Sequence, residues 1–507
     1  MKGKALPVRN GIQRLGGAVS LYLRETDTMT RRYSGHAPPE TAVRGSAWFY
    51  VLMSVVAITV IIVLFRGQHE SKPFPGETVR NSTRTDASGG LSHLQPTRLG
   101  PNRPKSTPTL TAEEIVTGKV VQFARSRREI ARGIAARLSK ELPAEIQEFF
   151  DAVESGKWEE IKARWDPLAR RSGQYEYSTN GLADLEPYWA AVLDAYGVAE
   201  QAHLWPAQKL LDYGNAVLDS LRPGMVYVGG TDNGRWIPEL LNETSGDQHI
   251  ILTQNALADS RYLDWVSTLY TDRMTTLTSE DSQAAFQGYV DNAQKRFEHD
   301  QQFPDEPKQV RPGEDIRMVD GKIQVGGRTS VMAINERLLQ TLMQKNPDLS
   351  FAIEESFPLK GTYADALPLG PLMELGVNDG RNTFTPERAM ESLQYWQMMT
   401  QQLSSDPEVA NSSTALKSYS HDAVSAANLL AAHNFSEEAE QAYNLATQLW
   451  PGNPESVNGL ADVLVGAGRE REARQLLDDF VRQYPDEQQT LQQMSAYWRL
   501  ISPAHSQ

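Results

Sequence analysis

The chain has 507 residues, of which 40% are hydrophobic and 8% aromatic, enough for roughly two to four domains with apolar cores. It contains no cysteine, which excludes disulfide scaffolds, thiolate zinc sites, iron–sulfur clusters and cysteine nucleophiles. The net charge is −14 and the acidic surplus lies after residue 110, so we expect the soluble part to repel phosphate backbones and to bind no nucleic acid.

Residues 46–65 form an uncharged apolar run, SAWFYVLMSVVAITVIIVLF. A helix of this length spans the hydrocarbon core of a bilayer, which is about 30 Å thick. We therefore predict one transmembrane helix here. One alternative is a buried core helix, which rarely lacks a polar stripe over such a length. The other is a cleavable signal peptide, which is disfavoured because no small-x-small cleavage site follows the run.

The segments on either side of this run bear on its orientation. Residues 1–45 are a basic tail, and residues 66–110 are rich in Pro, Gly, Ser and Thr, which predicts a flexible linker. Arginines flank the run on both sides, so the positive-inside rule is nearly balanced. Because the first segment is short and the large body follows, we predict a single-pass protein of the cell membrane with a cytoplasmic N-terminus and a periplasmic body.

Residues 111–221 show helical periodicity throughout. Thr111 precedes two acidic residues and is a suitable N-cap. A helix that includes Phe149 breaks at Gly156, and a second amphipathic stretch begins at Trp158. This pattern predicts helices that pack through aromatic side chains.

Residues 222–380 change to an alternation of short apolar runs and helical stretches. The strand–helix–strand–helix order predicts a small parallel α/β core. We expect the part that follows the last predicted strand to be irregular, and at least one of the adjacent Glu354 and Glu355 to be exposed to solvent. The predicted strands are residues 224–230, 249–254, 322–325 and 351–353, and the predicted helices are residues 236–242, 259–270 and 334–344.

Polar residues follow the first two predicted strands. In open α/β sheets ligands bind beyond the carboxyl ends of the strands, and glycines there allow close approach of the backbone. The alternative is a capped turn in which Asp232 and Asn233 satisfy the start of a helix. The candidate ligand-binding residues are Gly229, Gly230, Thr231, Asp232, Asn233, Arg235, Asn255 and Asp259.

This strand, polar turn, aromatic helix and second strand are similar to a segment of bacterial polytopic membrane proteins related to protein O-mannosyltransferases. The resemblance covers residues 222–270 and lies in the soluble C-terminal part of those proteins. It implies a shared accessory fold. Transferase activity is not implied, because this chain lacks the polytopic membrane part.

The last hundred residues contain an internal repeat with a period of 34 residues, and residues 384–503 are predicted to form a helical array. The small alanines let helices approach closely, and each proline ends a helix. The aligned pairs are Ala427 with Ala461, Leu430 with Leu464, Asn434 with Gly468, Ala439 with Ala473, Tyr443 with Leu477, Ala446 with Phe480 and Pro451 with Pro485.

This period and these positions resemble the tetratricopeptide repeat. The tryptophan expected early in each repeat is replaced by Ala423 and Val457. Two repeats fall short of the three that usually make a stable stack, so we expect helices at residues 386–402 and 488–500 to complete it. The resemblance implies a surface that binds a protein partner. The alternative is that the array only packs on the α/β core.

No phosphate-binding, nucleophile-elbow or metalloprotease motif occurs, and no two histidines have the spacing of helical metal ligands. We therefore predict no catalytic residue, no metal site and no cofactor. The leading hypothesis is a single-pass membrane-anchored protein that mediates protein–protein interaction or scaffolding at the bacterial envelope. The alternative is an envelope enzyme or sensor that binds a polar ligand, such as a glycan, at the loop of residues 229–235.

Overall fold

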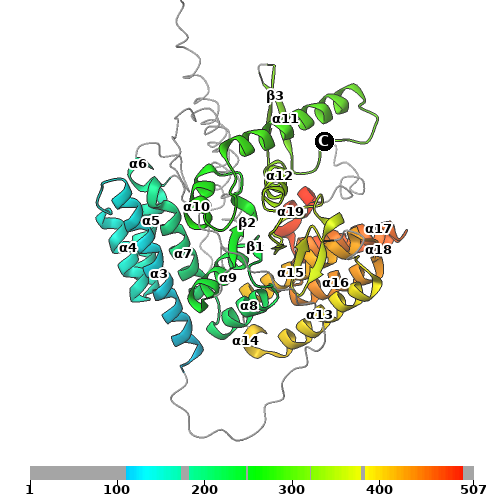
Figure 1. Cartoon of the computed structure of the whole chain (residues 1–507). Helices are drawn as coiled ribbons and strands as arrows, with labels where there is room; N and C mark the ends of the chain where they lie inside the picture. Colours follow the sequence, from blue (N-terminus) through cyan, green and yellow to red (C-terminus); the bar gives the residue numbers. More distant parts are fainter. Residues whose placement is uncertain are drawn as a thin grey trace, which may run out of the picture. The chain divides into compact units, whose positions relative to one another are not determined.

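A computed structural model describes residues 110–172, 182–246, 249–319, 321–377, 383–410 and 412–494 (Figure 1). The predicted basic tail, membrane span and linker, residues 1–109, lie outside the described residues. All described residues lie within one compact unit of the chain.

The first part of the described chain is helical, as its periodicity predicts. Thr111 is the N-cap of the first helix: its hydroxyl accepts a hydrogen bond from the Glu114 amide at 3.2 Å, and the Glu114 carboxylate accepts one from the Thr111 amide at 2.9 Å. The elements are α3 (Ala112–Arg137), α4 (Ala144–Ser155), α5 (Trp158–Arg171), α6 (Leu182–Leu185), η1 (Glu186–Tyr188), α7 (Trp189–Leu204) and α8 (Ala207–Asp219).

Aromatic packing holds these helices together. The ring of Trp165 stacks on that of Tyr196, with centroids 3.8 Å apart and planes 6° from parallel. Phe149 is fully buried and lies against Trp165. Gly156, which ends α4, has a φ of +71°, a left-handed conformation that glycine adopts without steric cost.

The central sheet has five strands in the order β2-β1-β5-β7-β6. The first three run parallel to one another, whereas β7 pairs antiparallel with both β5 and β6. The strands β1, β2, β5 and β7 are buried at every position. The bounds are β1 (Val226–Gly229), β2 (Ile250–Thr253), β5 (Phe351–Ile353), β6 (Leu367–Leu369) and β7 (Leu372–Leu375).

The predicted fold class needs two corrections. The sheet is mixed instead of parallel, because the region expected to be irregular forms the antiparallel hairpin of β6 and β7, whose strands are too short for periodicity to reveal them. Second, the described part of the chain is mostly helical, and none of its helices is long and apolar enough to cross a membrane. The predicted span itself lies outside the described residues.

Helices connect and cover the strands. The predicted strand at residues 322–325 is β4. It pairs with β3 in a separate two-stranded sheet and does not join the main sheet. The bounds are α9 (Asp232–Ser245), η2 (Gln254–Ala256), α10 (Ser260–Tyr270), α11 (Ser279–Gln302), β3 (Asp315–Val319), β4 (Lys322–Gly326), α12 (Arg328–Lys345) and η3 (Tyr363–Asp365).

The C-terminal part is an array of antiparallel helix pairs. The two turn positions that the 34-residue period aligns, Asn434 and Gly468, both have positive φ, +65° and +75°. Alanines at Ala427 and Ala439 are fully buried where helices approach. The helices are α13 (Pro386–Ser405), α14 (Pro407–Ala410), α15 (Ser413–Ala432), α16 (Ser436–Leu449), α17 (Pro454–Gly466), α18 (Glu470–Gln483), η4 (Pro485–Glu487) and α19 (Gln488–Met494).

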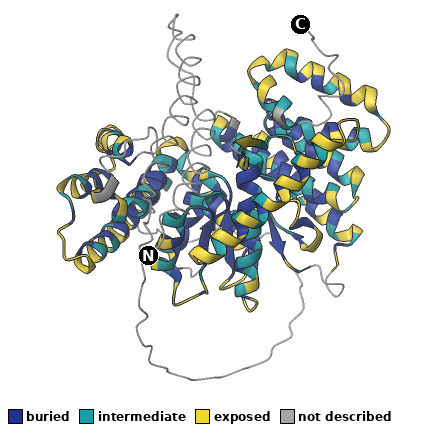
Figure 2. Ribbon diagram, turned by 90° about the horizontal axis from the view of Figure 1, so that it is seen from above, coloured by how far each residue is buried: buried dark blue, intermediate teal, exposed yellow. Residues whose placement is uncertain are grey.

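Helices flank the two repeats on both sides: α13 packs on α16, and α19 packs on α17. The second helix was expected over residues 488–500 and is described as far as Met494. Figure 2 shows the resulting pattern of burial, with exposed residues along the outer sides of the helices and buried residues on the sides that face other elements.

Candidate functional site

The turn after β1, where the sequence predicts a ligand site, is occupied by a side chain from another strand. Glu354 follows β5, is 2% exposed, and accepts hydrogen bonds from the Thr231 amide at 2.9 Å and the Thr231 hydroxyl at 2.8 Å. Its carboxylate also accepts a hydrogen bond from the Gly230 amide. The amides of the N-cap Thr231 and of Gly230 before it, which could hold an anion at the entry to α9, therefore already bind Glu354, and the Gly234 amide donates to the Thr231 hydroxyl.

The glycines of this turn are required by close contact. A Cβ atom at Gly234 would lie 2.0 Å from a carboxylate oxygen of Glu354, and one at Gly230 would lie 2.3 Å from the Ser356 amide nitrogen. Asn255, after β2, donates to the carbonyl of Gly230 and accepts from the Ser356 hydroxyl at 2.9 Å. The ends of β1, β2 and β5 are thus joined by one hydrogen-bond network.

Arg235 belongs to a different cluster. Its guanidinium lies 2.5 Å from Asp194 and 3.6 Å from Glu239. Arg127, which is 1% exposed, binds the same two carboxylates at 3.2 and 2.7 Å and Glu243 at 2.6 Å. Burial works to lower the pKa of Arg127, but the three carboxylates outweigh it and raise this pKa. The cluster joins α3, α7 and α9.

The remaining predicted residues are also placed by local contacts. Asp259 is the N-cap of α10, where it accepts from the Arg261 amide at 2.9 Å and pairs with that arginine's guanidinium at 3.1 Å. Asp232 is exposed at the first position of α9. The side-chain amide of Asn233 donates a hydrogen bond to the Tyr213 hydroxyl at 3.4 Å. The structure thus brings Gly230, Thr231 and Asn255 together and directs Arg235 and Asp259 to other partners. The ligand site stays a prediction.

Sequence reasoning missed the main feature of this region, a group of buried carboxyls between the sheet and α15. Glu354, Glu355 and Asp422 are each 2% exposed, so the expectation that one of the adjacent glutamates faces solvent was wrong. Both glutamates are buried because the repeat array covers the strand end from which they project. The only sequence signal was their position directly after an apolar strand.

Glu355 and Asp422 differ in how they are satisfied. Glu355 accepts hydrogen bonds from the Tyr363 hydroxyl and the Leu359 amide, each at 2.8 Å, and from the Asn428 amide at 3.4 Å. Burial nevertheless raises the pKa of Glu355 to about 7. Within the described ranges, neither carboxyl oxygen of Asp422 has a partner with the geometry of a hydrogen bond. Burial and the neighbouring Glu354 raise the pKa of Asp422 well above its ordinary value.

An ion pair next to this group connects the two repeats. Nδ1 of His421 on α15 lies 2.6 Å from a carboxylate oxygen of Glu455 on α17. Burial works to lower the pKa of His421, but Glu455 outweighs it and the pKa rises to about 10. Among the described residues, no group of three or more His, Asp or Glu side chains is arranged to hold a metal ion.

The repeat array contacts the α/β part mainly through α15, and α13 also packs on β6. The Ser425 hydroxyl donates to the Glu355 carbonyl at 3.2 Å, and Nε2 of His433 lies 2.7 Å from the Tyr363 carbonyl. The alternative interpretation of the repeats, that they pack on the α/β core, therefore describes α15. It leaves the other side of the array, formed by α13 and α16, to be considered as a binding surface.

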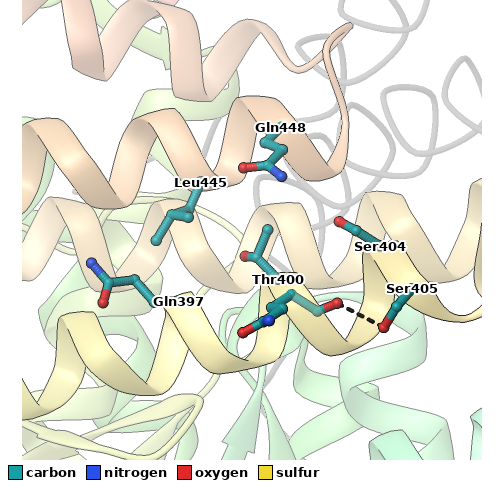
Figure 3. Close-up of a pocket in the computed structure, with 7 residues that line it drawn as sticks. Gln397, Thr400, Ser404, Ser405, Leu445 and Gln448 are labelled. Atoms are coloured by element: carbon teal, nitrogen blue, oxygen red, sulfur yellow. Dashed lines mark hydrogen bonds between the residues drawn. The ribbon is translucent and has the colours of Figure 1, made fainter.

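A groove of about 340 Å³ lies between α13 and α16 (Figure 3). Amide and hydroxyl side chains line it, and Leu445 adds an apolar side chain. The Thr400 hydroxyl is buried without a hydrogen-bond partner in the described structure, and Met398, next to the groove on α13, is 65% exposed. The lining residues are Gln397, Thr400, Gln401, Ser404, Ser405, Leu445 and Gln448.

Comparison with known proteins supports the repeat assignment. Residues 429–494 match the family model described as Tetratricopeptide repeat, a range that begins within α15 and contains α16, α17 and α18. No curated protein and no solved structure matches the chain, and the likeness of residues 222–270 to relatives of the O-mannosyltransferases finds no support. Residues 429–494 of this chain are thus similar to tetratricopeptide repeats.

Proposed function

We propose that this protein mediates a protein–protein interaction through the α13–α16 side of its repeat array. Tetratricopeptide arrays present extended surfaces that bind protein partners. The observation that carries the proposal is the groove between α13 and α16, which side chains of these two helices alone line.

The chemistry of the groove suits a polypeptide segment. Glutamine amides such as those of Gln401 and Gln448 both donate and accept, so they can pair with the N–H and C=O groups of a backbone. Exposed methionine is a flexible apolar side chain that adapts to different partners, and Met390 and Met398 are 53% and 65% exposed on α13.

Site-specific cross-linking tests this proposal in the full chain. A photo-reactive residue at Gln401 is expected to form a discrete adduct with a partner in cells, whereas the same residue at Met318, an exposed methionine of β3 outside the repeats, is expected to form none. With the partner identified and purified, the double variant M398A/Q401A should weaken binding roughly tenfold, and M318A should not change it. Equal cross-linking at both positions, or an unchanged affinity of the double variant, would contradict the proposal.

The envelope location and membrane attachment rest on residues outside the described part, and the location stays a proposal drawn from the sequence. Protease protection of a C-terminal tag in intact spheroplasts tests on which side of the membrane the body lies. For the alternative function, a polar ligand at the loop of residues 229–235, no observation adds support, because Glu354 occupies the helix start.

A further inference from the structure

The contact between α15 and the residues after β5 is unusual in its composition. Three fully buried carboxyls, Glu354, Glu355 and Asp422, meet there. The nearest imidazole, His421, already pairs with Glu455. Burial of charge is costly unless each charge is compensated, and this contact has more carboxyls than cations.

Asp422 is the least compensated member of this group: no donor meets its carboxyl oxygens with hydrogen-bond geometry in the described structure, and the nearby Tyr213 and His421 only partly offset its burial. Glu354 accepts three hydrogen bonds from the start of α9, so its oxygens act as acceptors. An ionised Asp422 placed against it would add a second acceptor and a second negative charge. A protonated Asp422 is neutral, and its O–H can donate. The close approach of α15 to the strand end therefore favours a proton on Asp422.

The elements around the contact offer mainly acids and neutral phenols. The cationic side chains nearby are His421 and Arg328 on α12, whose guanidinium donates to the Ser356 carbonyl at 3.1 Å and acts on Glu455. The titratable groups that face Asp422 are Glu354 after β5, Tyr213 on α8, Tyr227 on β1, Tyr395 on α13, and Tyr419 and His421 on α15. The titratable groups that face Glu355 are Tyr363 of η3, Tyr443 on α16 and His421.

We propose that this contact is a proton-dependent joint: protonated Asp422 and Glu355 hold α15 against the α/β part, and loss of these protons releases the repeat array. Hydrogen bonds from Ser425 and Asn428 to Glu355 mark the surface of α15 that release would uncover. The inference does not depend on which partner the array binds.

The direction of the pH dependence follows from the protons that the closed state holds. A carboxyl whose pKa is higher in the closed state than in the open state stabilises the closed state. This stabilisation is complete at a pH below the ordinary pKa of the carboxyl, and it is lost as the pH rises through the pKa of the closed state. The pKa of Glu355 in the closed state is about 7, so part of this loss falls near neutral pH. The pKa of His421 is about 10, so this imidazole keeps its positive charge near neutral pH and does not reverse the effect.

A distance measurement tests the joint in the full chain. Because the chain has no cysteine, spin labels can be placed on two introduced cysteines, T268C on α10 and Q441C on α16, both at exposed positions. As the pH rises from about 6 to about 9, we expect the distribution of distances between the two labels to gain a longer component, which represents the open state. The ratio of open to closed molecules should increase about tenfold per pH unit for each proton that closure requires. A reference pair within the array, Q441C with Q475C, should not change.

Three variants distinguish this joint from general unfolding. D422N and E355Q keep a neutral side chain at every pH, so each is expected to remove or reduce the long component at about pH 9. E200Q removes a different carboxyl whose pKa burial raises to about 7, on α7, and should behave like the wild type. If D422N does not fold, E355Q carries the test alone. A constant distance in the wild type, or a parallel change in the reference pair, would overturn the proposal.

Discussion

Nδ1 of His421 lies 2.6 Å from a carboxylate oxygen of Glu455, and this ion pair joins the first helices of two successive repeats. The two residues are 34 positions apart, so the pair connects equivalent places in adjacent repeats. Both side chains are about a fifth exposed, 18% and 21%, and this partial burial makes the pair strong enough to matter for stability.

Removing one partner of this pair should destabilise the array. We expect E455A to lower the free energy of unfolding by about 2–4 kcal/mol, somewhat less than is typical of a fully buried pair, because it leaves the imidazolium without its carboxylate. Urea denaturation measures the loss. The control is R469A, which breaks the more exposed pair of Arg469 with Glu440 and should cost clearly less. Equal losses would show that the His421 pair has no special role.

The same pair should give the array a defined pH range of stability. The pKa of His421 rises from 6.5 to about 10, so its contribution is complete below 6.5 and is lost as the pH rises through about 10. His421 holds the pKa of Glu455 below 4.5, so that contribution is present above 4.5 and is lost on acidification. The melting temperature of H421Q, measured across this range, should vary less with pH than that of the wild type; an identical profile would contradict the prediction.

Arg127 should be among the most sensitive positions of the α3–α7–α9 cluster. R127A leaves three carboxylates, Asp194, Glu239 and Glu243, around the site of the lost guanidinium. Because Arg235 still pairs with Asp194 and Glu239, we expect a loss at the lower end of the range for a broken buried pair, about 3 kcal/mol. R125A is the matched control, since Arg125 pairs with Glu154 at the surface and is 68% exposed. Chemical denaturation of both variants decides the question, and similar midpoints for the two would argue against a structural role of the cluster.

Variants at Arg235 and Asp232 test whether the turn after β1 binds a ligand or has a structural role. Because Arg235 is bound to Asp194 and Asp232 is exposed, R235A should lower the melting temperature whereas D232A should leave it nearly unchanged. The ligand hypothesis expects both variants to keep the melting temperature and lose binding. Thermal unfolding of the two variants tells the two apart.

The turn glycines provide a test of packing at the sheet edge. G234A would place a Cβ atom 2.0 Å from the Glu354 carboxylate and should cost about 1–3 kcal/mol, because Glu354 must move away from the start of α9. In G133A, within α3, the new Cβ meets nothing within 4 Å, and the substitution should stabilise by about 0.5–1 kcal/mol. A stabilising G234A would mean that the contact is looser than described.

Local pattern was sufficient for much of the fold. The capping box at Thr111, the helix end at Gly156 and the strands after Arg222 each follow from residues that are close in sequence. The repeat is the clearest case, because the paired turn positions Asn434 and Gly468 both adopt the left-handed conformation that their residue types tolerate.

Long-range pairing was not accessible in the same way. The antiparallel hairpin of β6 and β7 has strands of only three and four residues, so no periodicity distinguishes it from an irregular segment. For the candidate ligand residues, the sequence placed Thr231 and Asn255 at one sheet edge correctly. It could not show that Arg235 binds Asp194, which is 41 residues away.

The sequence by itself determined the helical repeat, the position of the three parallel strands and the absence of thiol chemistry, because these depend on residue type and on spacing along the chain. Only the tertiary structure decided that Glu354, Glu355 and Asp422 share one buried contact and that Glu354 occupies the start of α9. The reason is that burial and pairing of a carboxyl depend on which distant elements cover it, and the packing of α15 on the strand ends brings together residues that lie about seventy positions apart.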